Sequence, residues 1–285
     1  MITALARAKI NLTLDVLYKR QDGYHEIETV MQSIGLHDRL EFRPAGGGIS
    51  LVVEGKGVPR GADNLVFRAA ELVRSRTGTK KGVAIHLTKA IPVAAGLGGG
   101  SADAAVTLSV LNKMWEAGFS PAELLKLGEQ LGADVPFFLQ GGTALARGKG
   151  ERLERLPPCP ALGLVLVKPP FGVQTAAVYR VCSPGQALVK PGTRAMLEAI
   201  REGNAAGIAK RLANALEPVV FGMYPQIAQI KERLMKAGAI GALMSGSGPT
   251  VFGLTADLES ARALAGRYSE PGMQVIVTEC YNNTC

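Results

Sequence analysis

Residues 92–105 read Pro92-Val-Ala-Ala-Gly-Leu-Gly-Gly-Gly-Ser-Ala-Asp-Ala-Ala105, with four glycines in five positions. The stretch follows a strand-like run over residues 82–88 and opens a helix that we expect from Ser101 to Trp115. Glycines let a ligand approach the main chain, so consecutive N–H groups can converge on phosphate oxygens. The start of the helix adds its positive dipole end. The stretch therefore predicts an anion-binding loop.

Two other glycine-rich phosphate loops fit this stretch less well. A Walker A loop ends in Gly-Lys-Ser/Thr, whereas Gly100-Ser101 is followed by Ala102. A Rossmann fingerprint that starts at Gly96 needs its third glycine at position 101, and it belongs in the first βαβ unit of a chain. A Rossmann oxidoreductase is therefore a distant alternative. A tight turn that binds no ligand is the remaining alternative from the loop alone.

The composition favours a globular protein with an anionic ligand. Of the 285 residues, 47% are hydrophobic and 20% are charged, which argues against disorder. The net charge is +8, but no run of Lys and Arg exceeds two residues. We therefore expect a small phosphorylated ligand and no nucleic-acid partner. Composition does not determine the oligomeric state, for which we expect a monomer or weak homodimer.

The cysteines and the apolar segments predict a cytoplasmic protein. Cys159, Cys182, Cys280 and Cys285 show no CxxC spacing, and no histidine lies at metal-ligand spacing from them. We expect unbridged thiols in a reducing compartment. The N-terminus lacks the apolar stretch of a signal peptide, and the longest apolar run, residues 161–167, is too short to span a bilayer.

The first half of the chain predicts strands and capped helices. Alternation over residues 10–16 predicts a strand, with Lys9 and Asn11 on its polar face. That polar face would either be solvent-exposed or line a cleft, and the residues alone favour neither. Further strands are expected over Glu26–Ile34, Arg39–Arg43, Ile49–Val53 and Gly82–Thr88. Asn64 and Ser120 are expected to cap helices, the second with a capping box.

Three prolines in Leu156-Pro-Pro-Cys-Pro160 predict a boundary between a domain of residues 1–157 and one of residues 158–285. In the second domain we expect strands at 162–167, 242–244, 250–254 and 274–278. Its helices are expected near 175–181, 193–202, 204–216, 225–237 and 258–268. This order predicts an α+β sandwich. A second glycine-rich loop, Met244-Ser-Gly-Ser-Gly-Pro-Thr250, lies between two of the strands.

Asp134 directly precedes the apolar run Val135-Pro-Phe-Phe-Leu139. Its carboxylate would be largely desolvated there unless it has a partner or a chemical role. As the N-cap of a short helical turn it would have a structural role instead. The residues leave both interpretations open.

Five motifs in order resemble those of the GHMP kinases, small-molecule phosphotransferases whose Gly-Leu-Gly-Gly loop replaces Walker A. They are Ala8-Lys-Ile-Asn-Leu12, Asp22-Gly-Tyr-His-Glu26, residues 92–105, Gly132-Ala-Asp-Val-Pro-Phe137 and Ser245-Gly-Ser-Gly-Pro-Thr250. The resemblance spans most of the chain and implies a two-domain α+β fold. An N-terminal nucleotide-binding domain and a C-terminal ferredoxin-like α/β sandwich would enclose the active site in the cleft between them. It also implies ATP and Mg²⁺ as cofactors.

The resemblance further implies the acceptor and the catalytic pair. The motifs are similar to those of members that phosphorylate the 2-hydroxyl of a cytidine diphosphate sugar alcohol in the non-mevalonate isoprenoid pathway. Asp134 would take the proton of the hydroxyl, with Lys9 beside it. A lysine there keeps the carboxylate ionised and meets developing negative charge, whichever of the two dominates the proton transfer.

The remaining site residues are also implied by the resemblance. Acceptor-binding residues would be Asn11, Tyr24, His25, Thr175, Tyr179, Gly246, Ser247 and Gly248, with the cytosine near the tyrosine and histidine rings. Nucleotide-binding residues would be Asn64, Lys89, Pro92, Gly96, Leu97, Gly98, Gly99, Gly100, Ser101, Ala102, Asp103 and Asn112. Ser101 is a candidate for Mg²⁺, although no paired carboxylates define a metal site. Structural alternatives are a helix cap for Asn64, a solvated strand end for Lys89, a helix surface for Asn112 and an ordinary core ring for Tyr179.

Two other functions stay open from the sequence. One is a GHMP kinase for mevalonate, homoserine or galactose, against which Tyr24 and His25 argue because those acceptors have no base to stack. The other is a catalytically silent nucleotide-binding relative, against which Lys9 and Asp134 argue. Arg147 and Lys149 make their segment more basic than the resemblance leads us to expect, which would add phosphate attraction near the cleft.

Overall fold

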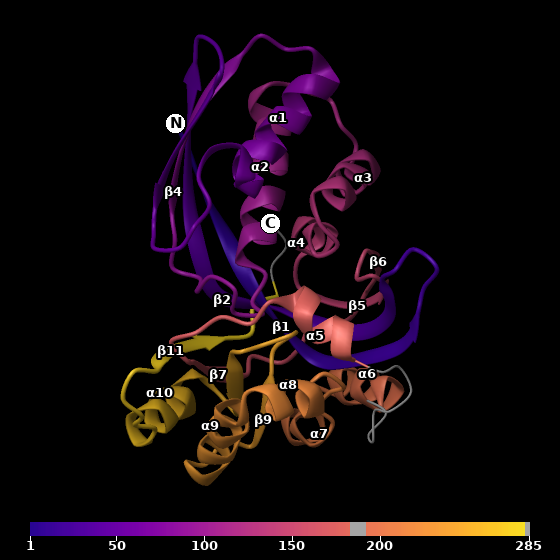
Figure 1. The fold of residues 1–285 in the computed structure, drawn as a ribbon, viewed down its shortest axis with the longest axis vertical. Helices are drawn as coiled ribbons and strands as arrows, with labels where there is room; N and C mark the ends of the chain where they lie inside the picture. The colour runs from indigo at the N-terminus through magenta and orange to yellow at the C-terminus, as the bar shows by residue number, and fades with distance from the viewer. Residues whose placement is uncertain (183–191, 283–285) are drawn as a thin grey trace.

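The computed structural model describes residues 1–182 and 192–282 and contains two sheets (Figure 1). The first sheet has the strand order β3-β4-β2-β1-β8, and β5 pairs with both β2 and β6. Its strands are β1 (Ile2–Lys19), β2 (His25–Ala45), β3 (Ile49–Glu54), β4 (Gly82–Thr88), β5 (Thr143–Gly148), β6 (Arg152–Arg155) and β8 (Ala213–Asn214).

The long antiparallel strands β1 and β2 pair with each other at the centre of this sheet. We predicted two strands within residues 26–43, but β2 is one continuous strand. Gly35 lies at the predicted break, and a Cβ atom there would come within 3.0 Å of Thr278 Oγ1. The glycine thus permits close packing of the C-terminal strand rather than a turn.

Four helices cover one face of the first sheet (Figure 1). They are α1 (Leu65–Thr77), α2 (Gly99–Met114), α3 (Pro121–Leu131) and α4 (Val135–Gln140), and a short 3₁₀ turn, η1 (Gly61–Asp63), precedes α1. The predicted caps are confirmed: Asn64 accepts a hydrogen bond from Val66 N, and Ser120 and Glu123 form a capping box. Apolar side chains of the helices pack against those of the sheet, as Leu108 and Phe42 do in one buried cluster.

The second sheet is antiparallel and has the order β11-β7-β10-β9. Its strands are β7 (Gly163–Lys168), β9 (Gly241–Met244), β10 (Val251–Thr255) and β11 (Gln274–Glu279). The helices α9 (Pro225–Lys236) and α10 (Leu258–Arg267) pack on it, and α5 (Thr175–Val181) lies where the two halves meet (Figure 1). The predicted α+β architecture is confirmed.

One helix prediction is wrong. Instead of a helix over residues 204–216, α7 (Ala205–Lys210) ends early, and β8 and α8 (Glu217–Met223) follow it; α6 (Thr193–Arg201) precedes it. The two residues of β8 pair in parallel with Thr13 and Leu14 at the edge of β1. This pairing satisfies the backbone hydrogen bonds of Ala213 and Asn214 at the edge of the sheet. Helix propensity, which depends only on residue type, cannot predict such a tertiary contact.

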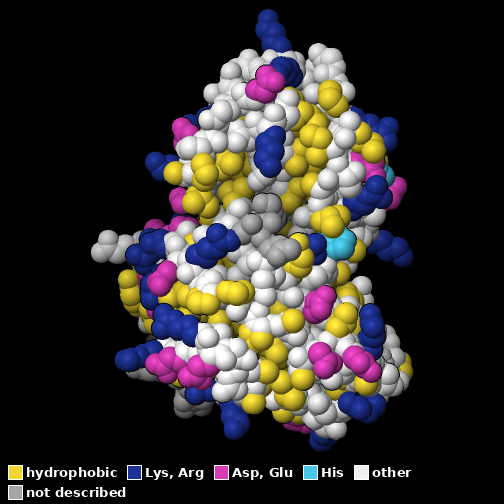
Figure 2. All heavy atoms as spheres, turned by 180° about the vertical axis from the view of Figure 1, so that it is seen from behind, with side chains coloured by type: hydrophobic (Ala, Val, Ile, Leu, Met, Phe, Trp, Pro, Cys, Tyr) yellow, Lys and Arg dark blue, Asp and Glu magenta, His cyan; other side chains and the backbone are white. Residues whose placement is uncertain are grey.

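The second half of the chain therefore completes the first sheet, and the domain boundary after residue 157 stays a prediction. No helix of the described residues is long and apolar enough to cross a membrane. On the face drawn in Figure 2, Lys and Arg side chains are spread among Asp and Glu instead of forming one basic patch.

Candidate active site

A cavity of about 930 Å³ lies between the two halves of the molecule. Predicted site residues that line it are Lys9, Asn11, Tyr24, His25, Asn64, Lys89, Pro92, Gly96, Gly98, Gly99, Gly100, Ser101, Asp103, Asp134, Thr175, Tyr179, Gly246 and Ser247. Both glycine-rich loops and the start of β1 thus meet at one place. The predicted residues outside this lining are Leu97, Ala102, Asn112 and Gly248.

Lys9 and Asp134 lie side by side in the cavity. The Lys9 Nζ is 3.8 Å from Asp134 Oδ2 and donates a hydrogen bond of 2.6 Å to Asn11 Oδ1. Asn11 Nδ2 in turn donates to Thr29 Oγ1 at 2.8 Å. Lys9 and Asn11 are buried, so the polar face of β1 lines a cleft and is not solvent-exposed. Register shifts in the β1–β2 pairing flank both residues, as is common beside active sites.

The environment of this pair leaves the carboxylate available for chemistry. Burial lowers the pKa of Lys9, and the charge of Asp134 opposes that shift. Asp134 occupies the predicted N-cap position of α4, but its side chain makes no cap hydrogen bond, so capping does not account for the carboxylate. About a third of the Asp134 side chain is exposed, and the residue lines the cavity.

The first glycine loop is shaped by close contacts that only glycine allows. Gly96 and Gly98 have φ values of 76° and 72°. A Cβ at Gly96 would overlap the main-chain oxygen of Ser245, and one at Gly98 would lie 2.5 Å from Phe138 Cζ. The carbonyl of Leu97 accepts a hydrogen bond from Lys9 N at 3.1 Å, while the Leu97 side chain is buried in the core. Leu97 thus holds β1 through its main chain.

The second glycine loop is held by a residue that sequence reasoning missed. Asn214 Nδ2 donates hydrogen bonds of 2.8 Å to the carbonyls of Met244 and Gly246. The sequence offered no signal for this role because Asn214 fell within a predicted helix. Thr175 Oγ1 lies 2.7 Å from Ser247 Oγ, which ties the start of α5 to the same loop.

Lys89 lies in a buried group of charges at the entry to the first loop. Its side chain is 7% exposed and pairs with Asp38 and, at 2.7 Å, with Asp103 Oδ2, so it is not a solvated strand end. Asp38, which we did not predict, also accepts hydrogen bonds from the main-chain N–H groups of Ala90 and Ile91. Burial raises the pKa of Asp103 to about 7, and the charge of Lys89 opposes that rise. Asp103 Oδ1 is buried without a hydrogen-bond partner.

Aromatic rings also line the cavity. The rings of His25 and Tyr179 have centroids 5.3 Å apart, and the Lys149 Nζ lies 4.7 Å from the ring centroid of Tyr24. Tyr24 is 59% exposed, so its ring is open to a ligand. Burial lowers the pKa of His25 and raises that of Tyr179, which keeps imidazole and phenol neutral near pH 7. A neutral imidazole offers one donor and one acceptor to a base edge.

The two predicted asparagines differ in their surroundings. Asn64 lines the cavity and also caps α1, so the structural and the binding interpretations are compatible. Asn112 lies near the far end of α2, and its side-chain amide is paired with the main-chain N–H and carbonyl of Phe119. These bonds explain Asn112 as a structural residue that joins the end of α2 to the next loop.

Metal ligands and thiols add little to the site. Within residues 1–182 and 192–282, no group of three or more His, Cys, Asp and Glu is placed to hold a metal ion. Ser101 lines the cavity beside the Gly132 segment, since a Cβ at Gly132 would lie 3.8 Å from Ser101 Oγ.

Cys159 and Cys280 are buried free thiols, Cys182 is a partly buried one, and Cys285 lies outside the described residues.

Comparisons with known proteins agree with this geometry. The family descriptions "GHMP kinases N terminal domain" and "GHMP kinases C terminal" match residues 64–142 and 196–272. A crystal structure of a 4-(cytidine 5'-diphospho)-2C-methyl-D-erythritol kinase is 38% identical, with a TM-score of 0.84 over 99% of this chain and 100% of that one. A homoserine kinase from Cytophaga hutchinsonii, 21% identical with a TM-score of 0.77 over 99% of this chain and 95% of its own, shares the fold.

Relatives of higher identity carry one name. The 4-diphosphocytidyl-2-C-methyl-D-erythritol kinase of Pelotomaculum thermopropionicum is 68% identical over 99% of both chains. The protein of the same name from Moorella thermoacetica is 52% identical over 98% of both.

The fold, the two glycine loops and these matches define the chain as a GHMP kinase, an ATP-dependent kinase of small molecules. Within that class it belongs to the family of the 4-diphosphocytidyl-2-C-methyl-D-erythritol kinases. The predicted two-domain GHMP kinase fold, the kinase activity and ATP as its phosphoryl donor are thereby confirmed.

Proposed function

We propose that the protein transfers the γ-phosphoryl group of ATP to the 2-hydroxyl of 4-diphosphocytidyl-2-C-methyl-D-erythritol in the non-mevalonate isoprenoid pathway. The observation that carries the proposal is the Lys9–Asp134 pair in a cavity that the first glycine loop and three aromatic side chains, Tyr24, His25 and Tyr179, also line. The names of the relatives support this acceptor.

The first loop would hold the phosphates of ATP. Its glycines leave no side chain between the main chain and the cavity, and the dipole of α2 adds positive potential at its start. Lys89 and Asn64 line the neighbouring wall, where the adenosine would lie. Asp103 lines the same wall, and its buried Oδ1 has no hydrogen-bond partner among the described residues.

Asp134 would serve as the base. The acceptor oxygen forms a bond to the γ-phosphorus as the bond to the β,γ-bridging oxygen breaks, and ADP leaves. The proton of the hydroxyl passes to the Asp134 carboxylate, with no phosphoenzyme between. The Lys9 ammonium, 3.8 Å away, would balance the negative charge that develops near the acceptor oxygen.

A magnesium ion carried by the phosphates fits the site. The hydroxyl of Ser101 lines the cavity, and Mg²⁺ in such sites takes one or two protein ligands plus phosphate oxygens and water, so Ser101 would be its ligand from this chain. When bound, the ion would neutralise charge on the transferring group.

A direct assay tests the proposal. Purified protein with Mg-ATP should release ADP when the diphosphocytidyl acceptor is present, and mevalonate or homoserine should support little release. Preference for one of those alcohols would replace the proposed acceptor. ATP binding without turnover on any of the three would point to a silent nucleotide-binding protein instead.

A further inference from the structure

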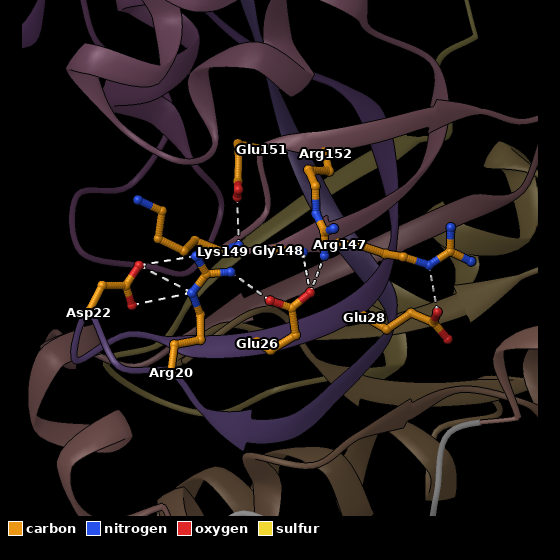
Figure 3. Close-up of polar contacts among 9 residues, drawn as sticks. All are labelled: Arg20, Asp22, Glu26, Glu28, Arg147, Gly148, Lys149, Glu151 and Arg152. Atoms are coloured by element: carbon orange, nitrogen blue, oxygen red, sulfur yellow. Dashed lines mark hydrogen bonds and ion pairs between the residues drawn. The ribbon is translucent and has the colours of Figure 1, made fainter.

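The turn that carries Tyr24 is fastened to the turn between β5 and β6 (Figure 3). Glu26, whose side chain is 7% exposed, lies between them. Its Oε2 accepts a hydrogen bond from Arg20 Nη1 at 2.6 Å, and its Oε1 accepts from Gly148 N at 3.1 Å and from Arg152. One buried carboxylate therefore fixes the distance between the two turns.

Each turn also has its own internal support. Asp22 accepts hydrogen bonds from Arg20 and, at 3.1 Å, from Tyr24 N, while Glu151 Oε2 accepts from Lys149 N at 2.6 Å. The result is that the Lys149 ammonium is held 4.7 Å from the centre of the Tyr24 ring. Both side chains line the cavity.

Lys149 differs from the arginines of this network because they have direct ion-pair partners. Arg20 pairs with Asp22 and Glu26, Arg152 pairs with Glu26, and Arg147 pairs with Glu28 at 2.9 Å and Glu154 at 3.4 Å. Within the part of the chain that the structure describes, the Lys149 ammonium makes no direct ion pair of this kind, although its charge acts on Asp22 at longer range, and Figure 3 draws no contact from it. Its charge is therefore available to a ligand.

The turn that holds Lys149 also reaches the reacting centre. A Cβ at Gly150 would lie 3.5 Å from Asp134 Oδ1, so the next residue along the turn borders the proposed base. An acceptor with its pyrimidine at Tyr24 and its hydroxyl at Asp134 must pass this turn with the part that joins them. In a diphosphocytidyl acceptor that part is a diphosphate.

We propose that Lys149 binds the diphosphate of the acceptor and selects for acceptors that carry one. This inference rests on the proposed function, because it takes the acceptor from there. Lys19 and Arg180 also line the cavity, so the test has to separate Lys149 from the general positive potential.

Equilibrium binding distinguishes a specific contact of Lys149 from the general positive potential of the cavity, and it requires no turnover. Calorimetry would compare cytidine 5'-diphosphate with cytidine for the wild type, Lys149→Gln, Lys149→Arg and Lys80→Gln. Lys80 is an exposed lysine outside the cavity lining and makes the same change in net charge. A charge-assisted contact corresponds to about a tenfold or larger preference for the diphosphate.

Lys149→Gln should lose about tenfold of that preference and bind cytidine as before, while Lys149→Arg and Lys80→Gln keep it. An undiminished preference in Lys149→Gln, or an equal loss in Lys80→Gln, would overturn the inference. In turnover, Lys149→Gln should raise KM for the diphosphocytidyl acceptor and leave KM for ATP unchanged. If wild-type protein does not phosphorylate that acceptor, the proposed function fails, whereas turnover with an unchanged KM in the variant removes only the role of Lys149.

Discussion

The hydroxyl of Ser245 donates a hydrogen bond of 2.9 Å to the carbonyl oxygen of Gly96. This contact joins the two glycine-rich loops, which lie about 150 residues apart in the chain, at the wall of the cavity. The nucleotide loop is thus shaped from both halves of the protein, and its conformation depends on their packing.

Gly96→Ala should distort this junction. The added Cβ would overlap the Ser245 carbonyl oxygen at a φ of 76°, so we expect a loss of at least about 2 kcal/mol in the free energy of unfolding, together with a higher KM for ATP. Urea unfolding and steady-state kinetics measure both. Gly100→Ala is the stability control, because its Cβ would only meet Leu65 Cδ1 at 3.5 Å. Equal stability of the two variants would contradict the argument.

Asp134→Asn should remove the base but keep the shape of the side chain. We expect kcat to fall by about 10²- to 10⁴-fold because an amide cannot take the proton of the acceptor hydroxyl. ATP affinity should change little, since the phosphate loop is intact. An ADP-release assay and ATP titration measure the two effects, and undiminished turnover would refute the assignment.

Tyr24→Ala should weaken the acceptor and spare ATP. Stacking of a base on an aromatic ring contributes about 1–3 kcal/mol, so KM for the diphosphocytidyl acceptor should rise by roughly five- to 150-fold. Tyr24→Phe retains the ring and should stay within a few-fold of the wild type. An alanine variant with the wild-type KM would show that the exposed ring does not stack on the base.

Asp103 should make stability depend on pH. Its pKa is about 7 in the folded protein and near its ordinary value of 3.8 in the unfolded chain, so the folded state binds more protons between these values. The contribution of this group to the free energy of unfolding therefore decreases as pH rises from about 4 to 7. Asp103→Asn should remove that decrease, which urea unfolding at pH 5 and pH 7.5 measures. The same pH dependence in both proteins would exclude the effect.

Local patterns in the sequence predicted the elements that local interactions stabilise. The helix caps at Asn64 and Ser120 and the glycine loop before α2 follow from residue types within a few positions of one another. The order of five motifs predicted the class of kinase, since each motif is short and continuous in the chain.

Relations between distant residues needed the tertiary structure. Local periodicity gives the faces of β1, but whether Lys9 faces solvent or a cleft depends on what packs over it. The roles of Asp38, Asn214 and Glu26 come from partners between 6 and 126 positions away, and a hydrogen bond or an ion pair acts through space, not along the chain. The sequence by itself determined the loops and the class of chemistry, whereas packing decided which polar groups are buried, paired and left free for a ligand.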